Sequence, residues 1–535
     1  MSLRNDLSGM TTECAGTSVD DRLTQILFNS GGAVVDSPEA VLREHIPNSL
    51  ALIQTFVAIE DEYRITLDYS GFHYEMTVAN LVEEIRRAPS REHAGGIADG
   101  DRPDRDDGRA VIPLNPIQTA YALGSHDGIE LGGQATFVYC EVRYSYPVDE
   151  VVAAANAVLA RHEVDGYVLD LDSGVLYREV CDQRPIRPAL GGDGDRVRAQ
   201  LMDQARASNE TGPLIAGVVV EDADGARLLI YLNMIIADAG SVYVFLNEVD
   251  DMLDGRDLNP VMSIVEATQR VGSVHRARDR VRDLDYWREM SGRLPTRPDF
   301  GVTVAGTEQW EMTRKQFVVE HETLTRLESN ALINKVSLSA LLLAVNAAEV
   351  ARWVNCSGLT VNVTVSERSA LDARRPVIGD FTSSILVGVD VDGVTSVPQL
   401  SRSIGRSIDE GLAHRSFLRG GGDQTAATAP IVFTSYVGGS GGERLRSRLD
   451  HVYSQTAQVC LDIQVMPRGD QLVISWDLVA DYFPQAEAMF SRMMAAVAEV
   501  ADGREILPLL DPVSELAISD YNNTRRPTTE HTVLS

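Results

Sequence analysis

The chain has 535 residues, of which 44% are hydrophobic and 24% are charged, so it is long enough for roughly two to four domains with their own cores. Its formal net charge of -30 disfavours nucleic acid and anionic membrane surfaces as partners, because both require a basic protein face. No apolar run reaches the length that a bilayer requires. The five cysteines are scattered without the paired spacing of a metal site, so we expect reduced thiols, no bound metal and a cytoplasmic protein.

The N-terminal residues predict a small helical unit. Residues 1–20 are polar and typical of disorder, whereas 21–88 show helical periodicity. A first helix is expected over Asp21–Phe28, and a last one over Thr77–Arg87 with Thr77 as its cap. Residues 89–110, rich in Gly, Asp, Arg and Pro, then predict a linker and a domain boundary.

A second helix of this unit is predicted to begin at Asn48-Ser49-Leu50, after a proline-containing loop. A serine at a helix N-terminus exposes its hydroxyl, and the helix dipole favours a phosphodiester attached there. Taken in isolation, the same pattern is a simple helix cap, so both interpretations remain open at this point.

From Val111 onward, strand-like runs alternate with helical periodicity, which is typical of layered α/β packing. A break between two lobes is expected near residues 285–310. The predicted strands are Gln134–Arg143, Leu228–Ile236 and Leu359–Val365, and the predicted helices are Val148–His162 and Ser337–Val354.

The segment Asn233-Met-Ile-Ile-Ala-Asp238 carries a polar pair five residues apart at the end of an apolar run. Small residues follow, and a helix is expected to start at Ser241. Local chemistry alone favours a strand end followed by a capped helix. An Asp also interrupts the apolar strand Val459–Val465, at Asp462. That carboxylate faces solvent by alternation, or it is buried for a purpose at considerable cost.

Several segments, in order along about 400 residues, resemble the heterocyclization branch of the condensation superfamily of nonribosomal peptide synthetases. They are Pro113–Gly124, Ala155–His162, Asp285-Tyr-Trp287 with Leu294-Pro295, Val377-Ile-Gly-Asp-Phe-Thr-Ser383, Pro430–Ser435, Ser454–Asp462, and Trp476-Asp477 with Phe483-Pro484. The family writes its core signature as two histidines, three spacers and Asp-Gly, or as Asp, four spacers and Asp in the cyclization branch. This chain keeps Asp238, but it has Asn233 at the first position and Met234 at the second histidine.

The resemblance implies a chloramphenicol-acetyltransferase-like fold doubled in one chain, with an N-terminal lobe over 111–290 and a C-terminal lobe over 291–518. Such domains join an acyl thioester to the amine of carrier-bound Cys, Ser or Thr, then cyclodehydrate the product to a thiazoline or oxazoline. The catalytic pair of the family maps onto Thr434 and Asp462, and a carboxylate beside a hydroxyl suits the proton transfers involved. Gln455 and Gln458 are expected to add hydrogen bonds to the intermediate.

The resemblance also implies structural roles for other motif residues. Asp238 is expected to hold the lobes together through a buried charge pair with Arg368, and Ser241 and Asp380 are further motif residues. Asn233 keeps the hydrogen-bonding shape of the family's Asp but cannot serve as a base. Glu367 stands where the family often has Asn, in Ser366-Glu-Arg368.

Residues 21–88 resemble a peptidyl carrier domain, a four-helix bundle whose Asp-Ser-Leu is Asn48-Ser49-Leu50 here. The resemblance implies 4'-phosphopantetheine on Ser49, attached by a phosphopantetheinyl transferase. Expected partners are an upstream acyl-loading module and a downstream adenylation and carrier protein that presents Cys, Ser or Thr. Residues 519–535 resemble the linker that leads into an adenylation domain, so the chain is expected to be either an excised piece or a stand-alone protein served by other subunits.

Three functions follow as hypotheses. The first is condensation with heterocyclization, which the retained Thr434 and Asp462 favour. The second is amide or ester formation without ring closure, which Asn233 and Glu367 favour. The third is a non-catalytic scaffold that recruits carrier proteins, with Ser49 in a degenerate carrier.

Overall fold

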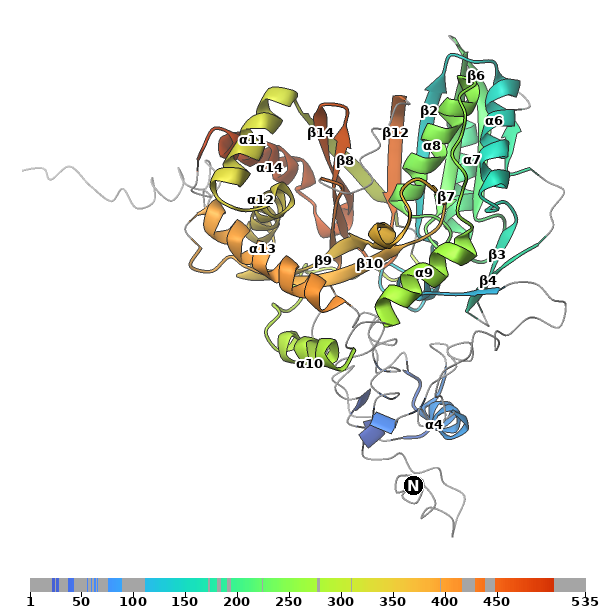
Figure 1. The fold of residues 1–535 in the computed structure, drawn as a ribbon. Helices are drawn as coiled ribbons and strands as arrows, with labels where there is room; N and C mark the ends of the chain where they lie inside the picture. Colours follow the sequence, from blue (N-terminus) through green and yellow to red (C-terminus); the bar gives the residue numbers. More distant parts are fainter. Residues whose placement is uncertain are drawn as a thin grey trace, which may run out of the picture.

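A computed structural model describes the chain in two parts (Figure 1). In the N-terminal part the described residues are 22–24, 26–27, 37–42, 55, 59, 62–63, 65 and 76–88. From residue 111 the chain is described to residue 504, except 172–173, 180–183, 190–193, 224, 277–279, 309, 395, 416–428 and 438–447. The predicted helix start at Asn48 and Ser49 therefore lies outside the described residues, as does most of the expected carrier bundle.

The first half of the body is built on a five-stranded sheet. Its strand order is β12-β2-β7-β6-β5, with all neighbours antiparallel except the parallel pair β5 and β6. The strands are β2 (Phe137–Tyr144), β5 (Ile186–Pro188), β6 (Ile215–Asp222), β7 (Gly225–Asn233) and β12 (Arg448–Gln455).

Both faces of this sheet are covered by helices, because apolar side chains point alternately to each face. Helices α6 (Val148–Arg161) and α8 (Ala239–Leu253) share one hydrophobic cluster with Val142 and Ile230 of the sheet. Helix α7 (Gly194–Arg206) packs on the opposite face, where Tyr139 and Tyr231 are buried.

The second half is built on a six-stranded sheet in the order β10-β9-β11-β13-β14-β8. The strands are β8 (Met312–Val319), β9 (Gly358–Ser366), β10 (Thr382–Asp390), β11 (Ile431–Ser435), β13 (Leu461–Arg468) and β14 (Gln471–Val479). Helices pack beside the sheet: α11 (His321–Ile333), α12 (Leu338–Trp353), α13 (Val397–Ala413) and α14 (Ala486–Ala501).

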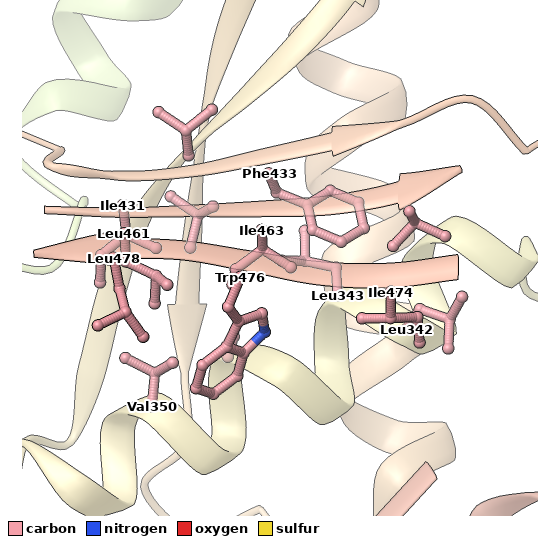
Figure 2. Packing of buried hydrophobic residues seen from close by; sticks show 14 of the residues in the cluster. Leu342, Leu343, Val350, Ile431, Phe433, Leu461, Ile463, Ile474, Trp476 and Leu478 are labelled. Atoms are coloured by element: carbon pink, nitrogen blue, oxygen red, sulfur yellow. The ribbon is translucent and has the colours of Figure 1, made fainter. Parts of the chain in front are cut away.

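One face of the six-stranded sheet is apolar and packs against α12 (Figure 2). Phe433, Ile463 and Trp476 project from three neighbouring strands toward this helix, and the Trp476 indole donates a 2.7 Å hydrogen bond to Asn346 Oδ1. Truncating a buried aromatic such as Trp476 typically costs 3–5 kcal/mol, roughly a third of a domain's stability. This core holds the opposite, polar face of the sheet in place.

Strand β12 joins the two halves. It belongs by sequence to the second half, yet it pairs with β2 at the edge of the first sheet (Figure 1). It also contacts β14 and β8 of the second sheet. The polar face of the second sheet therefore lies against the first half at β12.

Shorter elements complete the body. Helix α5 (Pro116–Leu123) starts with a capping box between Asn115 and Gln118 and has proline at its first turn, which are favourable start signals. The remaining elements are β1 (Val111–Pro113), β3 (Tyr167–Asp170), β4 (Val175–Arg178), α9 (Ile264–Arg276) and α10 (Arg280–Ser291). The first three of these form a separate sheet in the order β1-β4-β3.

In the N-terminal part, helix α4 (Val78–Arg87) confirms the predicted last helix and its Thr77 cap, which forms a capping box with Asn80. Its buried residues share a cluster with Ile129 of the body, so this part packs against the loop after α5. Within the described residues, no single helix is long and apolar enough to cross a membrane, although α11 and α12 reach the criterion together across a 101° bend.

Candidate functional site

Asp238 joins the two halves through the expected ion pair with Arg368, which lies in the short helix η3 (Glu367–Ala370). The Arg368 guanidinium donates from Nε (2.9 Å) and Nη2 (2.6 Å) to the Asp238 carboxylate, which is almost fully buried. Asp238 also accepts from the backbone N of Phe381 at 3.2 Å. A Cβ added at Gly240 would lie 2.5 Å from Arg368 Nε, so a glycine two residues after Asp238 leaves space for the guanidinium.

Asp238 is in addition the N-cap of α8, and this corrects the predicted helix start. The helix begins at Ala239, and Ser241 is its third residue, forming a reciprocal capping box with Asp238. The Ser241 hydroxyl also donates to Gly379 O in the second half at 2.9 Å. Both motif residues therefore act in the junction between the halves.

Asn233 ends β7 and is fully buried in a network of amides and hydroxyls. Its Nδ2 donates to Ser208 Oγ and to Asn209 Oδ1, both at 2.7 Å, and its Oδ1 accepts from Ile235 N at 2.9 Å. The bonds to Ser208 and Asn209 require an amide donor at this position, because a carboxylate could only accept. Asparagine at position 233, where the family has Asp, thus fits its hydrogen-bonding partners.

Thr434 and Asp462 lie on the same face of the six-stranded sheet. In the parallel pairing of β11 with β13, Thr434 is opposite Gln464, and Asp462 is opposite Val432, so the side chains of 432, 434, 462 and 464 point to one side. This is the face opposite the Trp476 core. Thr434 Oγ1 accepts a 3.1 Å hydrogen bond from Thr364 Oγ1.

The Asp462 carboxyl is buried beside a second carboxylate. Asp477 is directly opposite Asp462 on β14 and is fully buried, with Arg314 Nε 2.7 Å from its Oδ1. Gln464 Nε2 donates to Asp462 Oδ2 at 2.7 Å. Burial first, and then the charge of Asp477, raise the pKa of Asp462 to about 7.

Strand β12 contributes Ser454 to this cluster. Its hydroxyl lies 2.6 Å from Asp477 Oδ2 and 3.4 Å from Asp462 Oδ2, so the first half contacts both carboxyl groups. Sequence reasoning missed Ser454 and the charge pair of Arg314 with Asp477, although Ser454 and Asp477 lie within segments that carry the family resemblance. The sequence did not show on which face of its strand each of these residues lies.

Two buried oxygens of this face have no hydrogen-bond partner among the residues that the structure describes. They are Asp462 Oδ1 and Asn362 Oδ1, and both residues pair with Val432 from opposite sides of β11. Leaving such an atom unpaired costs about 1–3 kcal/mol. Two acceptors without partners therefore lie buried on the face of the sheet that bears Thr434.

The two glutamines that were expected to bind the intermediate lie in different surroundings. Gln455 is fully buried, donating to Gln134 Oε1 at 2.6 Å and accepting from Tyr453 OH at 2.7 Å. Because strand neighbours alternate, Gln455 points away from the face that Ser454 shares with Asp462. The amide of Gln455 is occupied by Gln134 and Tyr453 here, and its expected hydrogen bond to an intermediate stays a prediction. Gln458 follows in a left-handed conformation with φ of 66°.

Asp380 and Glu367 line a pocket between α5, α9 and the start of β10. Asp380 is 5% exposed, accepts from Thr382 N at 3.0 Å, and lies 3.4 Å from Asn115 Nδ2. Burial and the nearby Asp238 raise its pKa to about 7. Glu367 accepts from Ser383 Oγ at 2.7 Å and lies 3.3 Å from Arg415 Nε, so this acid is paired at the side of the pocket.

Comparison with known families decides what this two-sheet arrangement is. Residues 198–417 match the family model described as Condensation domain. This segment, less than half of the chain, is similar to condensation domains. The match covers Asn233–Asp238 of the first half and Arg368 of the second, and so includes the Asp238–Arg368 pair that joins the halves.

Relatives with curated names are larger proteins. The chain is 30% identical over 465 residues to pyochelin synthetase PchF of Pseudomonas aeruginosa, covering 79% of this chain and 25% of PchF. It is 26% identical over 459 residues to phenyloxazoline synthase MbtB of Mycobacterium tuberculosis, covering 78% of this chain and 32% of MbtB. The chain thus spans about a quarter to a third of the length of these relatives.

The same fold occurs in a solved structure, the cyclization-docking bidomain of the nonribosomal peptide synthetase EpoB from Sorangium cellulosum. The two superpose with a TM-score of 0.63 at 21% identity, over 73% of this chain and 85% of that one. The α/β condensation fold expected from the sequence is confirmed.

Proposed function

We propose that the condensation domain joins an acyl thioester to the amine of a carrier-bound Cys, Ser or Thr and then closes the side chain onto the new amide. The observation that carries the proposal is the Asp462 carboxyl, buried with one free oxygen on the face that also bears Thr434. Its pKa of about 7 lets it both donate and accept a proton near neutral pH. The names of the relatives, which include a phenyloxazoline synthase, support ring formation.

The proposed reaction has two stages, amide formation and ring closure. In the first, the amine forms a C–N bond with the acyl carbonyl, the C–S bond of the donor breaks, and the donor thiol leaves with a proton. In the second, the side-chain sulfur or oxygen adds to the amide carbon and loses its proton. The former carbonyl oxygen then leaves as water while the nitrogen loses its proton, which gives the C=N bond of the ring.

Asp462 is suited to the second stage. In its protonated form it gives a proton to the departing hydroxyl group, and as the carboxylate it takes one from the attacking group. The Thr434 hydroxyl, held by Thr364, is placed to hydrogen-bond the developing alkoxide. The Arg314 guanidinium balances the charge of the neighbouring Asp477, so the cluster can hold an ionised Asp462 transiently.

Residues 21–88 are proposed as the upstream carrier, with 4'-phosphopantetheine on Ser49 to hold the acyl group as a thioester. The remaining partners are an acyl-loading module, a phosphopantetheinyl transferase and a downstream protein that presents the acceptor amino acid. Ser49 lies outside the described residues, so its role rests on the local sequence resemblance.

A second candidate is condensation without ring closure, and the burial of Asn233 favours it. Its amide is occupied by Ser208 and Asn209, so the first position of the signature holds no ionisable group. The experiment that separates the two is intact-mass analysis after acyl loading of Ser49, with cysteinyl-, seryl- and threonyl-carriers as acceptors. Ring closure predicts a product one water lighter than the linear amide, which is lost in Asp462→Ala. A linear amide as the only wild-type product would refute ring closure and leave condensation.

A further inference from the structure

A polar strip leads from the Asp462 cluster to a second buried carboxyl group. Thr434 is bonded to Thr364, and Thr364 is opposite Ser384 in the pairing of β9 with β10. Two residues further toward the start of β10, on the same face, lies Thr382, whose backbone N donates to Asp380. The pocket at Asp380 is thus at one end of the face that carries Thr434 and Asp462.

The pocket has an apolar wall and a polar end. Ile117 of α5 and Ile264 and Val271 of α9 form part of the wall, and Asp380 is buried at the polar end. Moving a cation into such surroundings is costly unless a carboxylate meets it. Charged and titratable groups around Asp380 come from every neighbouring element: Tyr121, Asp238, Glu367, Arg368, Arg415 and Tyr436.

Most of these groups are already committed to a partner. Asp238 is paired with Arg368, and Glu367 with Arg415. The Asp380 carboxyl, by contrast, accepts from the Asn115 amide and from the backbone and side chain of Thr382, and no arginine among the described residues forms an ion pair with it. In the described part of the chain, Asp380 is therefore the acidic group of this pocket without a direct arginine partner, although the charge of Arg368 acts on it at longer range.

We propose that the pocket beside Asp380 receives the amino group of the acceptor, and that the Asp380 carboxylate accepts the proton that this ammonium group must lose before it attacks. This inference rests on the proposed function. It assigns the proton transfer of amide formation to Asp380, whereas ring closure uses Asp462. One proton passes from the ammonium nitrogen to Asp380, and the freed lone pair forms the C–N bond. The C–S bond breaks, and the leaving thiolate takes the second proton from the nitrogen.

The arrangement explains how a condensation domain works with Asn233 and Met234 in its signature. Neither side chain can act as a base, and Asp238 is held by an arginine and two backbone contacts. Burial raises the pKa of Asp380 to about 7, so a useful fraction is ionised near neutral pH and can accept a proton.

The test compares two acceptors in the full chain, with the donor supplied as an acyl N-acetylcysteamine thioester so that Ser49 is not required. One acceptor is a cysteinyl-carrier, and the other is its aminooxy analogue, whose –O–NH2 nitrogen is uncharged at neutral pH and therefore has no ammonium proton to lose. Intact mass measures total amide formation, whether or not the ring closes. For Asp380→Asn we expect a loss on the order of 10²-fold with the cysteinyl-carrier, and a much smaller loss with the aminooxy analogue.

The ratio of the two rates is measured in one preparation, so it does not depend on how much of the variant folds. Asp390→Asn, an exposed aspartate at the other end of β10, is the matched control and leaves both rates unchanged. Equal losses with both acceptors, or no loss with either, would overturn the inference. A wild-type protein that forms linear amide without a ring refutes only ring closure, whereas one that forms no amide refutes the proposed function together with this inference.

Discussion

Replacing Asp462 by asparagine is expected to stabilise the protein while it abolishes ring closure. A buried carboxyl whose pKa is raised in the folded state contributes most to stability at low pH, where folded and unfolded chains both hold the proton. That contribution is lost as the pH rises from the unfolded pKa of ~3.9 toward the folded pKa of about 7. The ionised Asp462 therefore weakens the folded state in neutral and alkaline solution.

The size of the effect follows from the two pKa values. The penalty is about 4 kcal/mol at pH 8 but only about 1.5 kcal/mol at pH 5, by proton linkage. Asparagine cannot ionise, so Asp462→Asn removes this penalty at both pH values. The new amide adds a cost of about 1–3 kcal/mol if its oxygen or an N–H stays unpaired. Because that cost is independent of pH, the difference between the two pH values isolates the carboxyl, and it amounts to roughly 2–3 kcal/mol.

The assay is urea denaturation of wild type and Asp462→Asn at pH 5 and pH 8, with the free energy of unfolding extrapolated to water. The gain in stability should be larger at pH 8. Asp390→Asn, at an exposed carboxylate, serves as control and should show no such pH dependence. A gain equal at both pH values, or larger at pH 5, would refute the assignment of a raised pKa to Asp462.

Three further substitutions test the junction and the site. Arg368→Met leaves the buried Asp238 carboxylate without its cation, and we expect a loss of about 3–5 kcal/mol in thermal or chemical denaturation. Asn233→Asp removes the donor to Ser208, and we expect a loss of about 1–3 kcal/mol with no gain in ring closure by intact mass. Thr434→Val keeps the shape and removes the hydroxyl, so ring closure should slow on the order of 10²-fold while linear amide formation is kept.

Each of these has its own control. Arg375→Met removes an arginine that pairs with the part-exposed Glu266, and it should leave the free energy of unfolding almost unchanged. If Arg368→Met costs no more than that, the charge pair does not hold the halves together. A faster cyclization by Asn233→Asp would show that the amide is a functional defect rather than a fit to its network. Thr434→Ser should retain ring closure, and a loss equal to that of Thr434→Val would contradict a role for the hydroxyl.

The sequence predicted the pair of Asp238 with Arg368 and the helices Val148–Arg161 and Leu338–Trp353 closely, because strong periodicity and a matched motif both pointed to them. It misplaced the start of α8 by two residues, because an Asp before small residues caps a helix as readily as a later Ser does.

The contents of the site were harder to predict for a different reason. Ser454 and Gln455 are adjacent and equally polar, yet one contacts Asp477 and the other is buried against Gln134. Two neighbouring residues of a strand point to opposite faces of the sheet. Which of them faces the site depends on how the strand packs against the other sheet, and the sequence of one strand does not show this. The same holds for Asp380, whose surroundings come from helices more than 100 residues away in sequence.

The route of β12 bears on how such enzymes can be recombined. A chimera joined at the lobe boundary near residue 290 takes β2 from one parent and β12 from the other, so the strand pair across Phe137 and Gln455 becomes a hybrid. A mismatched β12 would leave the edge of β2 unpaired and open to intermolecular pairing. The unit of exchange that preserves both sheets is the whole segment from Val111 to residue 504, transferred intact.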